Sequence, residues 1–155
     1  DADGLKLLSR LQDWHQLLKN TAILTPHPGE MSFLTGLTVA EIQANRVEIA
    51  QKYAQKWGHV VVLKGALTVV AAPSGKACVI PVATAALARA GTGDVLAGLI
   101  TGLRAQGVDP YQAALVGAYI HAQAGLIAAD QIGHEASVLA GDVLDAVPQV
   151  LSTVW

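Results

Sequence analysis

The residues from Gly91 to Asp94 are those whose types and spacing best suit chemistry. They read Gly91-Thr92-Gly93-Asp94 and precede a strongly apolar stretch that we expect to form a helix. Glycines let a ligand approach the backbone without meeting a β-carbon, and the first turn of a helix has unpaired N–H groups at its positive end. We therefore expect an anion site suited to a transferred phosphoryl group. The Asp94 carboxylate stands where it can accept a proton from an attacking hydroxyl.

Two other phosphate-binding motifs are absent from the sequence. The third glycine of a Gly-x-Gly-x-x-Gly dinucleotide fingerprint is missing, and no Gly-Lys-Ser or Gly-Lys-Thr of a P-loop occurs anywhere. A short glycine pattern by itself is also typical of an ordinary tight turn with an acid at the start of a helix. The chemical interpretation therefore needs support from other residues.

Polar residues at the ends of two expected strands give this support. Lys64 and Gly65 follow the β-branched run at 59–63, and His27 and Glu30 follow a shorter apolar run. Sheets of α/β proteins bind ligands at the carboxyl ends of their strands, and a lysine there can contact phosphate oxygens. Taken singly, Lys64 is also typical of a strand end, His27 of a loop and Glu30 of a helix N-terminus.

Alternating strands and helices must position these residues. We expect strands at 21–25, 59–63, 68–72 and 77–82, with a hairpin turn at 73–76 between the last two. We expect helices at 5–19 with a break near Asp13, from Pro28 to Gly36, at 39–57, from Gly91 to Gly107, at 110–129 and at 140–151. Thr38 and Glu41 form a capping-box pattern for the third of these helices. The order of the elements indicates an α/β fold with an inserted antiparallel hairpin.

Composition limits the class of protein and its partners. The 155 residues suffice for one domain, and a hydrophobic share of 52% against a charged share of 14% suggests extensive internal or interface surface. A net charge of −2 excludes a polybasic surface, so we expect neither nucleic acid nor a membrane as partner. The single cysteine, Cys78, excludes an intrachain disulfide. Without a signal peptide or an apolar run of about 18 residues, a cytoplasmic protein is the default expectation.

Three segments of the sequence together resemble the ADP/ATP-dependent NAD(P)H-hydrate dehydratases of the ribokinase-like superfamily. They occur in the family's order and at similar spacing, and they read Thr25-Pro26-His27-Pro28-Gly29-Glu30, Lys64-Gly65-Ala66-Leu67-Thr68 and Gly91-Thr92-Gly93-Asp94-Val95-Leu96-Ala97-Gly98. Residues 1–5, 119–125 and 140–142 add to the likeness, which covers essentially the whole chain. The resemblance implies a ribokinase-like layered sheet flanked by helices. Residues 1–155 would be the C-terminal portion of this single domain, truncated at the N-terminus.

The resemblance also implies a reaction and its co-substrates. The family removes water from hydrated NADH or NADPH, which carries a hydroxyl on its nicotinamide ring. That hydroxyl attacks the terminal phosphate of ADP or ATP, and loss of phosphate then restores the reduced nicotinamide. Mg²⁺ would screen the phosphates.

Individual roles follow by matching residues to the family's motifs. Asp94 would be the catalytic base, and His27 and Asp94 would contact the hydrate. Glu30 would act on the metal through its water shell. The nucleotide would be bound by Lys64, Gly65, Ala66, Leu67, Thr68, Gly91, Thr92 and Gly93.

One stretch departs from the family pattern. Thr84 and Ala86 stand where the family commonly has asparagine and glycine, which changes the expected shape of this loop. Arg89 in the same stretch is a candidate for a further phosphate contact. His121, on an apolar helix, is more typical of a hydrogen-bonded packing histidine than of a ligand.

Two other functions stay open at this point. A small-molecule kinase of the same superfamily would release a stable phosphorylated product. A nucleotide-binding fragment without turnover is the second alternative, because the chain begins abruptly at Asp1 and would lack an N-terminal half. A sheet cut in this way has an unpaired edge, so we expect a homo-oligomer. In many family members an epimerase domain precedes this one, and such a domain could belong to the parent chain.

Overall fold

The β-branched run after His59 forms a central strand with both faces covered. This strand, β2 (Val60–Leu63), is fully buried. Val61 and Leu63 pack into one hydrophobic cluster, and Val60 and Val62 pack into another on the opposite face. Successive side chains of a strand point to opposite faces, so an uninterrupted apolar run is what a strand between two helix layers requires. The structure is a computed structural model that describes residues 1–154, and Trp155 of the expected 1–155 unit lies outside the described residues.

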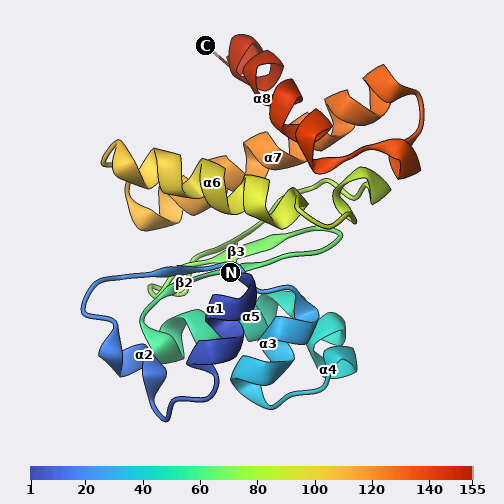
Figure 1. Cartoon of the computed structure of the whole chain (residues 1–155). Coiled ribbons are helices and arrows are strands. Elements are labelled where there is room, and N and C mark those ends of the chain that lie inside the picture. Colours follow the sequence, from blue (N-terminus) through green and yellow to red (C-terminus); the bar gives the residue numbers. More distant parts are fainter. Residues whose placement is uncertain (155) are drawn as a thin grey trace.

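Four strands form one mixed sheet across the middle of the molecule (Figure 1). Their order is β1 (Ile23–Leu24), β2, β3 (Val69–Ala71) and β4 (Ala77–Val79). β1 runs parallel to β2, whereas the β2–β3 and β3–β4 pairs are antiparallel. The α/β fold with an inserted antiparallel hairpin is therefore confirmed. Each strand is shorter than expected, although the flanking pairs Ala72–Lys76 and Thr68–Ile80 still form backbone hydrogen bonds of 2.8 Å.

Helices cover both faces of this sheet in two layers (Figure 1). One layer comes from the first part of the chain and the other from the last part. The first contains α1 (Ala2–Leu8), α2 (Trp14–Leu17), α3 (Pro28–Thr35), α4 (Val39–Ala44) and α5 (Arg46–Trp57). The second contains α6 (Thr92–Ala105), α7 (Pro110–Ile132) and α8 (Ala140–Val154), with single 3₁₀ turns at Ala85–Leu87 and Glu135–Ser137.

The capping box at Thr38 is confirmed, but the helix that it begins is shorter than expected. The Thr38 hydroxyl accepts from the Glu41 amide at 3.2 Å, and Glu41 Oε2 accepts from the Thr38 amide at 2.8 Å. The single helix expected at 39–57 is wrong, because the chain breaks at Asn45 (φ −135°, ψ 48°) and begins a new helix at Arg46. The apolar stripe continues across this break and so conceals it in the sequence.

Other helix boundaries also differ from those expected. The stretch at 5–19 forms two short helices, with Asp13 between them in the left-handed region at φ 48°. α7 and α8 both extend three residues beyond their expected ends. α6 and α7 pack closely at Gly117, where a β-carbon would lie 2.7 Å from Ile100 Cγ1. Among the described residues, no helix combines the length and apolarity needed to cross a membrane.

Candidate functional site

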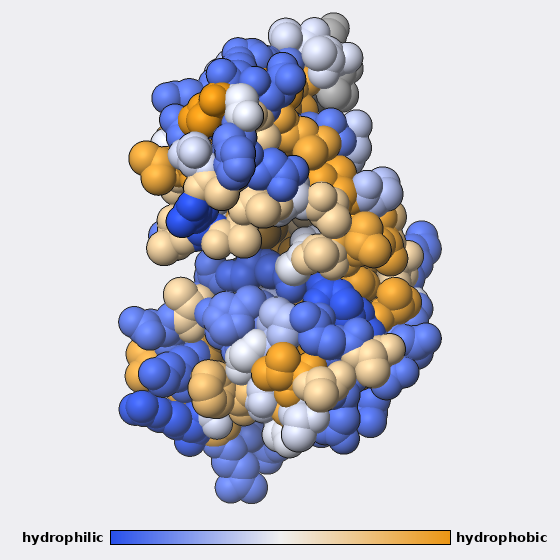
Figure 2. Space-filling view, turned by 90° about the vertical axis from the view of Figure 1, so that its right-hand side faces the viewer, coloured by the Kyte–Doolittle hydropathy of each residue, from blue (hydrophilic) through white to orange (hydrophobic). Residues whose placement is uncertain are grey.

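A cavity of about 320 Å³ lies where the residues that follow β1 and β2 meet the start of α6. His27 comes to it from the first of these strands, Lys64 from the second, and Gly93 from the helix. The molecule is notched between an upper and a lower part when viewed from the side (Figure 2). The expected convergence at the carboxyl edge of the sheet is therefore present in the structure.

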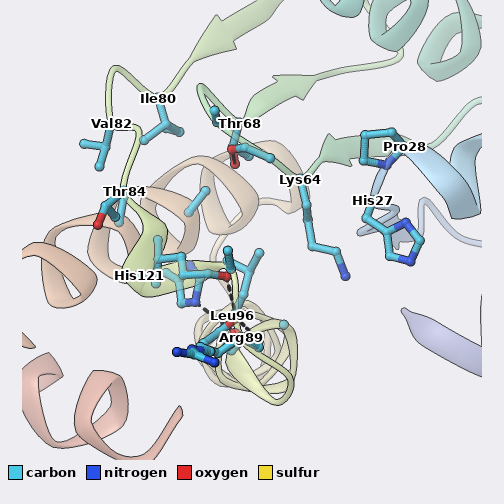
Figure 3. A pocket seen from close by; sticks show the side chains of 18 residues that line it. His27, Pro28, Lys64, Thr68, Ile80, Val82, Thr84, Arg89, Leu96 and His121 are labelled. Atoms are coloured by element: carbon cyan, nitrogen blue, oxygen red, sulfur yellow. Dashed lines mark hydrogen bonds between the residues drawn. The ribbon is translucent and has the colours of Figure 1, made fainter. Parts of the chain in front are cut away.

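Both apolar and polar side chains line the cavity (Figure 3). Apolar side chains line much of it: Ile80, Val82, Leu87, Leu96, Ala118 and Ala122. Polar groups come from His27, Lys64, Thr68, Thr84, Arg89, Thr92 and His121. Mostly apolar cavities with a few convergent polar groups are typical of small-molecule sites, and this volume falls at the lower end of their range.

Lys64 places its ammonium group between the two layers (Figure 3). It forms an ion pair with Asp1, and its Nζ lies 3.7 Å from Glu30 Oε2. Burial lowers the pKa of Lys64 below its ordinary value, and the charges of Glu30 and Asp94 oppose that shift. A lysine with two carboxylates nearby in a half-enclosed site is a cation that an incoming phosphate can engage.

The first turn of α6 retains one free amide. Its N-cap, Gly91, is left-handed at φ 89°. The Thr92 amide donates to Arg89 O at 3.3 Å, and the Asp94 amide donates to Gly91 O at 3.1 Å. Within the described chain, the Gly93 amide donates no hydrogen bond. The Gly93 N–H is therefore unpaired and stands at the positive end of the helix. Binding of an anion by residues 91–93 stays a prediction.

Thr92 and His121 fix this turn from behind. The Thr92 hydroxyl lies 2.8 Å from the carbonyl oxygens of both Leu87 and Arg89. His121 Nε2 lies 2.8 Å from Thr92 O, so this ring nitrogen carries the proton and donates it. Burial lowers the pKa of His121 to about 4, and the charge of Lys64 adds to this shift. The expected hydrogen-bonded packing histidine is confirmed, and it also lines the cavity.

Asp94 lies at the rim of the cavity and not in its lining. Its side chain is exposed, and its charge acts on Lys64. A carboxylate in this place is open to a substrate that enters from solvent. It has a neighbouring cation, but the structure shows no bond that would fix its orientation among the described residues.

His27 and Glu30 form the N-terminal cap of α3. His27 Nδ1 accepts from the Gly29 amide at 3.0 Å and from the Glu30 amide at 3.2 Å, while Glu30 Oε2 accepts from the His27 amide at 2.8 Å. This reciprocal arrangement is a capping box. The His27 ring stays 56% exposed at the mouth of the cavity, and its Nε2 lies 3.6 Å from Glu30 Oε1.

The segment from Lys64 to Thr68 has an unusual backbone. Gly65 has φ 140°, and Leu67, which is not a glycine, has φ 58°. Thr68 Oγ1 donates to Gly65 O at 3.1 Å across the loop. Ala66 lines the cavity, whereas Leu67 lies outside the lining and is 48% exposed. Strained residues of this kind persist only where the surroundings fix them, and they cluster at functional sites.

The loop that differs from the family pattern, around Thr84 and Ala86, is bonded to the 3₁₀ turn at Glu135–Ser137. Thr84 caps the first 3₁₀ turn by accepting from the Ala86 amide, and Ala86 is fully buried. Glu135 Oε2 accepts from the Ala85 amide at 3.1 Å. The Arg89 guanidinium lines the cavity but also donates to Ala136 O, so a phosphate would have to compete with that carbonyl.

The acidic groups do not form a metal cage. Among the described residues, no cluster of three or more His, Cys, Asp or Glu side chains is arranged to bind a metal ion. Glu30 Oε2 already accepts from the His27 amide and faces Lys64. This arrangement fits Mg²⁺ that arrives on nucleotide phosphates and keeps most of its waters.

Sequence reasoning did not assign some residues of the site. Asp1 has no assigned role in the sequence analysis beyond the likeness of residues 1–5, yet its carboxylate pairs with Lys64. Arg46 was not considered, yet its guanidinium donates to the carbonyls of Leu63 and Lys64. No signal in the sequence pointed to it, because the expected helix at 39–57 places Arg46 in a helix interior and the apolar stripe conceals the break at Asn45.

Comparison with known proteins adds an independent line of support. The model of the NAD(P)H-hydrate dehydratase family matches residues 1–149. A bifunctional NAD(P)H-hydrate repair enzyme of Moorella thermoacetica is 53% identical over 83% of this chain and 24% of its own length. An ADP-dependent (S)-NAD(P)H-hydrate dehydratase of Neisseria meningitidis is 42% identical over 94% of this chain and 50% of its own. The chain thus spans half or less of these relatives.

Solved structures agree with this assignment. An ADP/ATP-dependent NAD(P)H-hydrate dehydratase of Bacillus subtilis, co-crystallised with ATP and Mg²⁺, has a TM-score of 0.82 and 38% identity. The match covers 87% of this chain and 48% of that one. A ribokinase-like superfamily protein of Enterococcus faecalis has 23% identity and a TM-score of 0.73. That match covers 99% of this chain and 59% of the other chain, and it confirms the ribokinase-like fold. The chain therefore belongs to the NAD(P)H-hydrate dehydratase family.

Proposed function

We propose that this chain carries part or all of the catalytic site for the nucleotide-dependent dehydration of hydrated NADH or NADPH. ADP or ATP is the phosphoryl donor, as the names of the Neisseria and Bacillus relatives state for those proteins. The observation that carries the proposal is the meeting of the Lys64 ammonium with the first turn of α6 beside the cavity. Such a meeting suits an anion that gains charge during transfer.

The proposed reaction is a phosphoryl transfer followed by elimination of phosphate. The ring hydroxyl of the hydrate loses its proton to Asp94 while its oxygen attacks the terminal phosphorus of the nucleotide. The bond between that phosphorus and the bridging oxygen breaks, and AMP or ADP leaves. The ring carbon–oxygen bond then breaks, phosphate departs with its electron pair, and the adjacent ring carbon loses a proton. Reduced nicotinamide is restored.

Each residue of the site has a task in this scheme. Lys64 and the free amide of Gly93 contact phosphate oxygens, and the backbone from Gly65 to Thr68 follows the nucleotide. His27, exposed at the mouth, contacts the hydrate. Mg²⁺ bound to the phosphates supplies charge screening. Glu30 reaches it only through water, because one of its oxygens caps α3.

The direct test is to incubate the chain with hydrated NADH, Mg²⁺ and either ADP or ATP. Recovery of the absorbance of reduced nicotinamide, together with release of one phosphate per molecule repaired, would support the proposal. A stable phosphoester in place of reduced nicotinamide would favour a small-molecule kinase. Nucleotide binding without any turnover would identify a binding fragment whose activity needs the remaining length of its relatives.

We also propose that the chain works in a larger assembly. Within the described residues, β1 and β4 each pair on one side only, and such edges invite a partner. Apolar side chains near β4 are exposed, with Val79 at 39% and Tyr119 at 42%. A homo-oligomer, an N-terminal half of the domain and an upstream epimerase domain are the candidates. Light scattering on the purified chain tests the first, and a monomer at micromolar concentration would contradict it.

A further inference from the structure

Arg46 occupies an unfavourable place in its helix. It is the first residue of α5, directly after the break at Asn45. A positive charge at the N-terminus of a helix opposes the helix dipole, and the residue lies far along the sequence from every motif of the site. Its position therefore needs an explanation outside the helix.

The contacts of Arg46 supply that explanation. Its Nη2 donates to Leu63 O at 2.8 Å and to Lys64 O at 3.2 Å, at the end of β2. Its Nη1 donates to Gln43 Oε1 at 2.6 Å, which fixes the plane of the guanidinium. Its Nε is buried and, in the part of the chain that the structure describes, has no hydrogen-bond partner. An unsatisfied buried donor costs free energy, so the two carbonyls dictate this orientation.

The guanidinium also lies directly against the strained loop. A β-carbon on Gly65 would be 3.1 Å from Arg46 Nη1 and 3.2 Å from Nη2. Gly65 and Leu67 both have positive φ. Glycine adopts positive φ readily, so Leu67 is the strained residue of the loop. Arg46 is the side chain that bonds to the carbonyl immediately before the loop.

We propose that Arg46 is a positioning residue for the segment Lys64–Thr68: its guanidinium fixes the end of β2 so that the strained loop presents Lys64 to phosphate. The proposal deepens the proposed function and rests on it for the identity of the ligand. Arg46 acts through the backbone and touches no reacting atom. Its effect is therefore expected on nucleotide affinity more than on turnover.

The test compares three variants of the chain. Arg46→Met keeps a long apolar stem without donors, and Arg46→Lys keeps the charge without the fork. Lys56→Met is the matched control, because Lys56 is an exposed cation at the other end of α5. The first readout is the dissociation constant for ADP and ATP, together with KM and kcat where turnover is seen. The second is the rate of hydrogen exchange of the Leu67 amide, which donates to Val82 O at 3.2 Å.

Arg46→Met should weaken nucleotide binding about tenfold, the scale of one lost hydrogen bond to a charged group, with kcat changed less than about threefold. Exchange at Leu67 should accelerate about tenfold relative to the amides of α7. Arg46→Lys should fall between wild type and Arg46→Met, and Lys56→Met should match wild type. Wild-type affinity and wild-type exchange at Leu67 in a folded Arg46→Met protein would overturn the proposal.

The two proposals fail separately. If wild type binds no nucleotide while Arg46→Met still loosens Leu67, the proposed function fails and the positioning role stands. If Arg46→Met does not fold, the comparison passes to Arg46→Lys. Values for that variant equal to those of Lys56→Met in both readouts would then overturn the role of Arg46.

Discussion

Lys64 Nζ lies 3.3 Å from the point that a β-carbon on Gly93 would occupy, and Asp1 Oδ2 lies 3.4 Å from it. A residue after β2 thus lies close to Gly93, whose amide donates no hydrogen bond among the described residues, and a side chain at position 93 would press against the Lys64 ammonium group. Because a phosphate oxygen bound to both Lys64 and this amide needs that space, the absence of a side chain at position 93 is a condition for binding.

Gly93→Ala should therefore reduce affinity for ADP and ATP while the protein stays folded. The new methyl group meets the flexible end of Lys64, which can move, so we expect stability to change by less than about 1 kcal/mol. Displacing the ammonium from the phosphate should cost about tenfold or more in affinity. Isothermal titration calorimetry measures the affinity, and thermal unfolding reports stability.

Gly98→Ala is the control for this experiment. Gly98 lies in the same helix, and a β-carbon there would have no neighbour within 4 Å. Alanine is a better helix former than glycine, so the change should stabilise the protein by about 0.5–1 kcal/mol without altering affinity. Equal affinities for Gly93→Ala and Gly98→Ala would contradict the role assigned to the first turn of α6.

Asp94→Asn should abolish most turnover and leave binding largely intact. The amide has the shape of the carboxylate but cannot accept a proton, so the rate should fall at least about a hundredfold. Removing a negative charge beside the phosphate site should not weaken nucleotide binding. The measurement is the recovery of reduced-nicotinamide absorbance, with Asp130→Asn, an exposed acid of α7, as the control. A rate within threefold of wild type would remove Asp94 from the mechanism.

Two substitutions at Glu30 separate its cap from its charge. Glu30→Gln keeps an oxygen that can accept from the His27 amide, so stability should change little, whereas Glu30→Ala should lose about 1 kcal/mol. If the carboxylate acts on the metal through water, both variants should need more Mg²⁺ for half-maximal rate. Magnesium titrations combined with urea unfolding test both parts. Wild-type magnesium dependence in Glu30→Gln would leave Glu30 as a cap only.

The sequence could predict features whose cause is local. The Thr38 capping box depends on residues within one helical turn, and the structure contains it. The burial of β2 on both faces could also be predicted from its β-branched run, because the side chains on each face of the strand are apolar.

The remaining features depend on contacts between distant residues. The break at Asn45 coincides with the bonds of Arg46 to the end of β2, 17 residues away, and no local pattern encodes it. The ion pair of Lys64 with Asp1 joins residues 63 positions apart.

His121 should make stability depend on pH in a defined window. Its ring is 8% exposed, and burial lowers its pKa to about 4, against 6.5 in the unfolded chain. Above pH 6.5 both states are neutral and the residue adds no pH dependence. Between 6.5 and 4 the unfolded chain binds a proton that the folded chain does not, so stability is lost as the pH falls.

His121→Gln removes this titration and keeps a donor for Thr92 O. The free energy of unfolding, measured in urea at pH 7 and pH 4.5, should therefore fall less in the variant than in wild type, by about 2 kcal/mol. His134→Gln is the control, because His134 is an exposed histidine outside the cavity lining. Equal losses in wild type and His121→Gln would mean that the ring takes up its proton in the folded state. The hydrogen bond from His121 Nε2 to Thr92 O would then be compatible with a charged His121 ring.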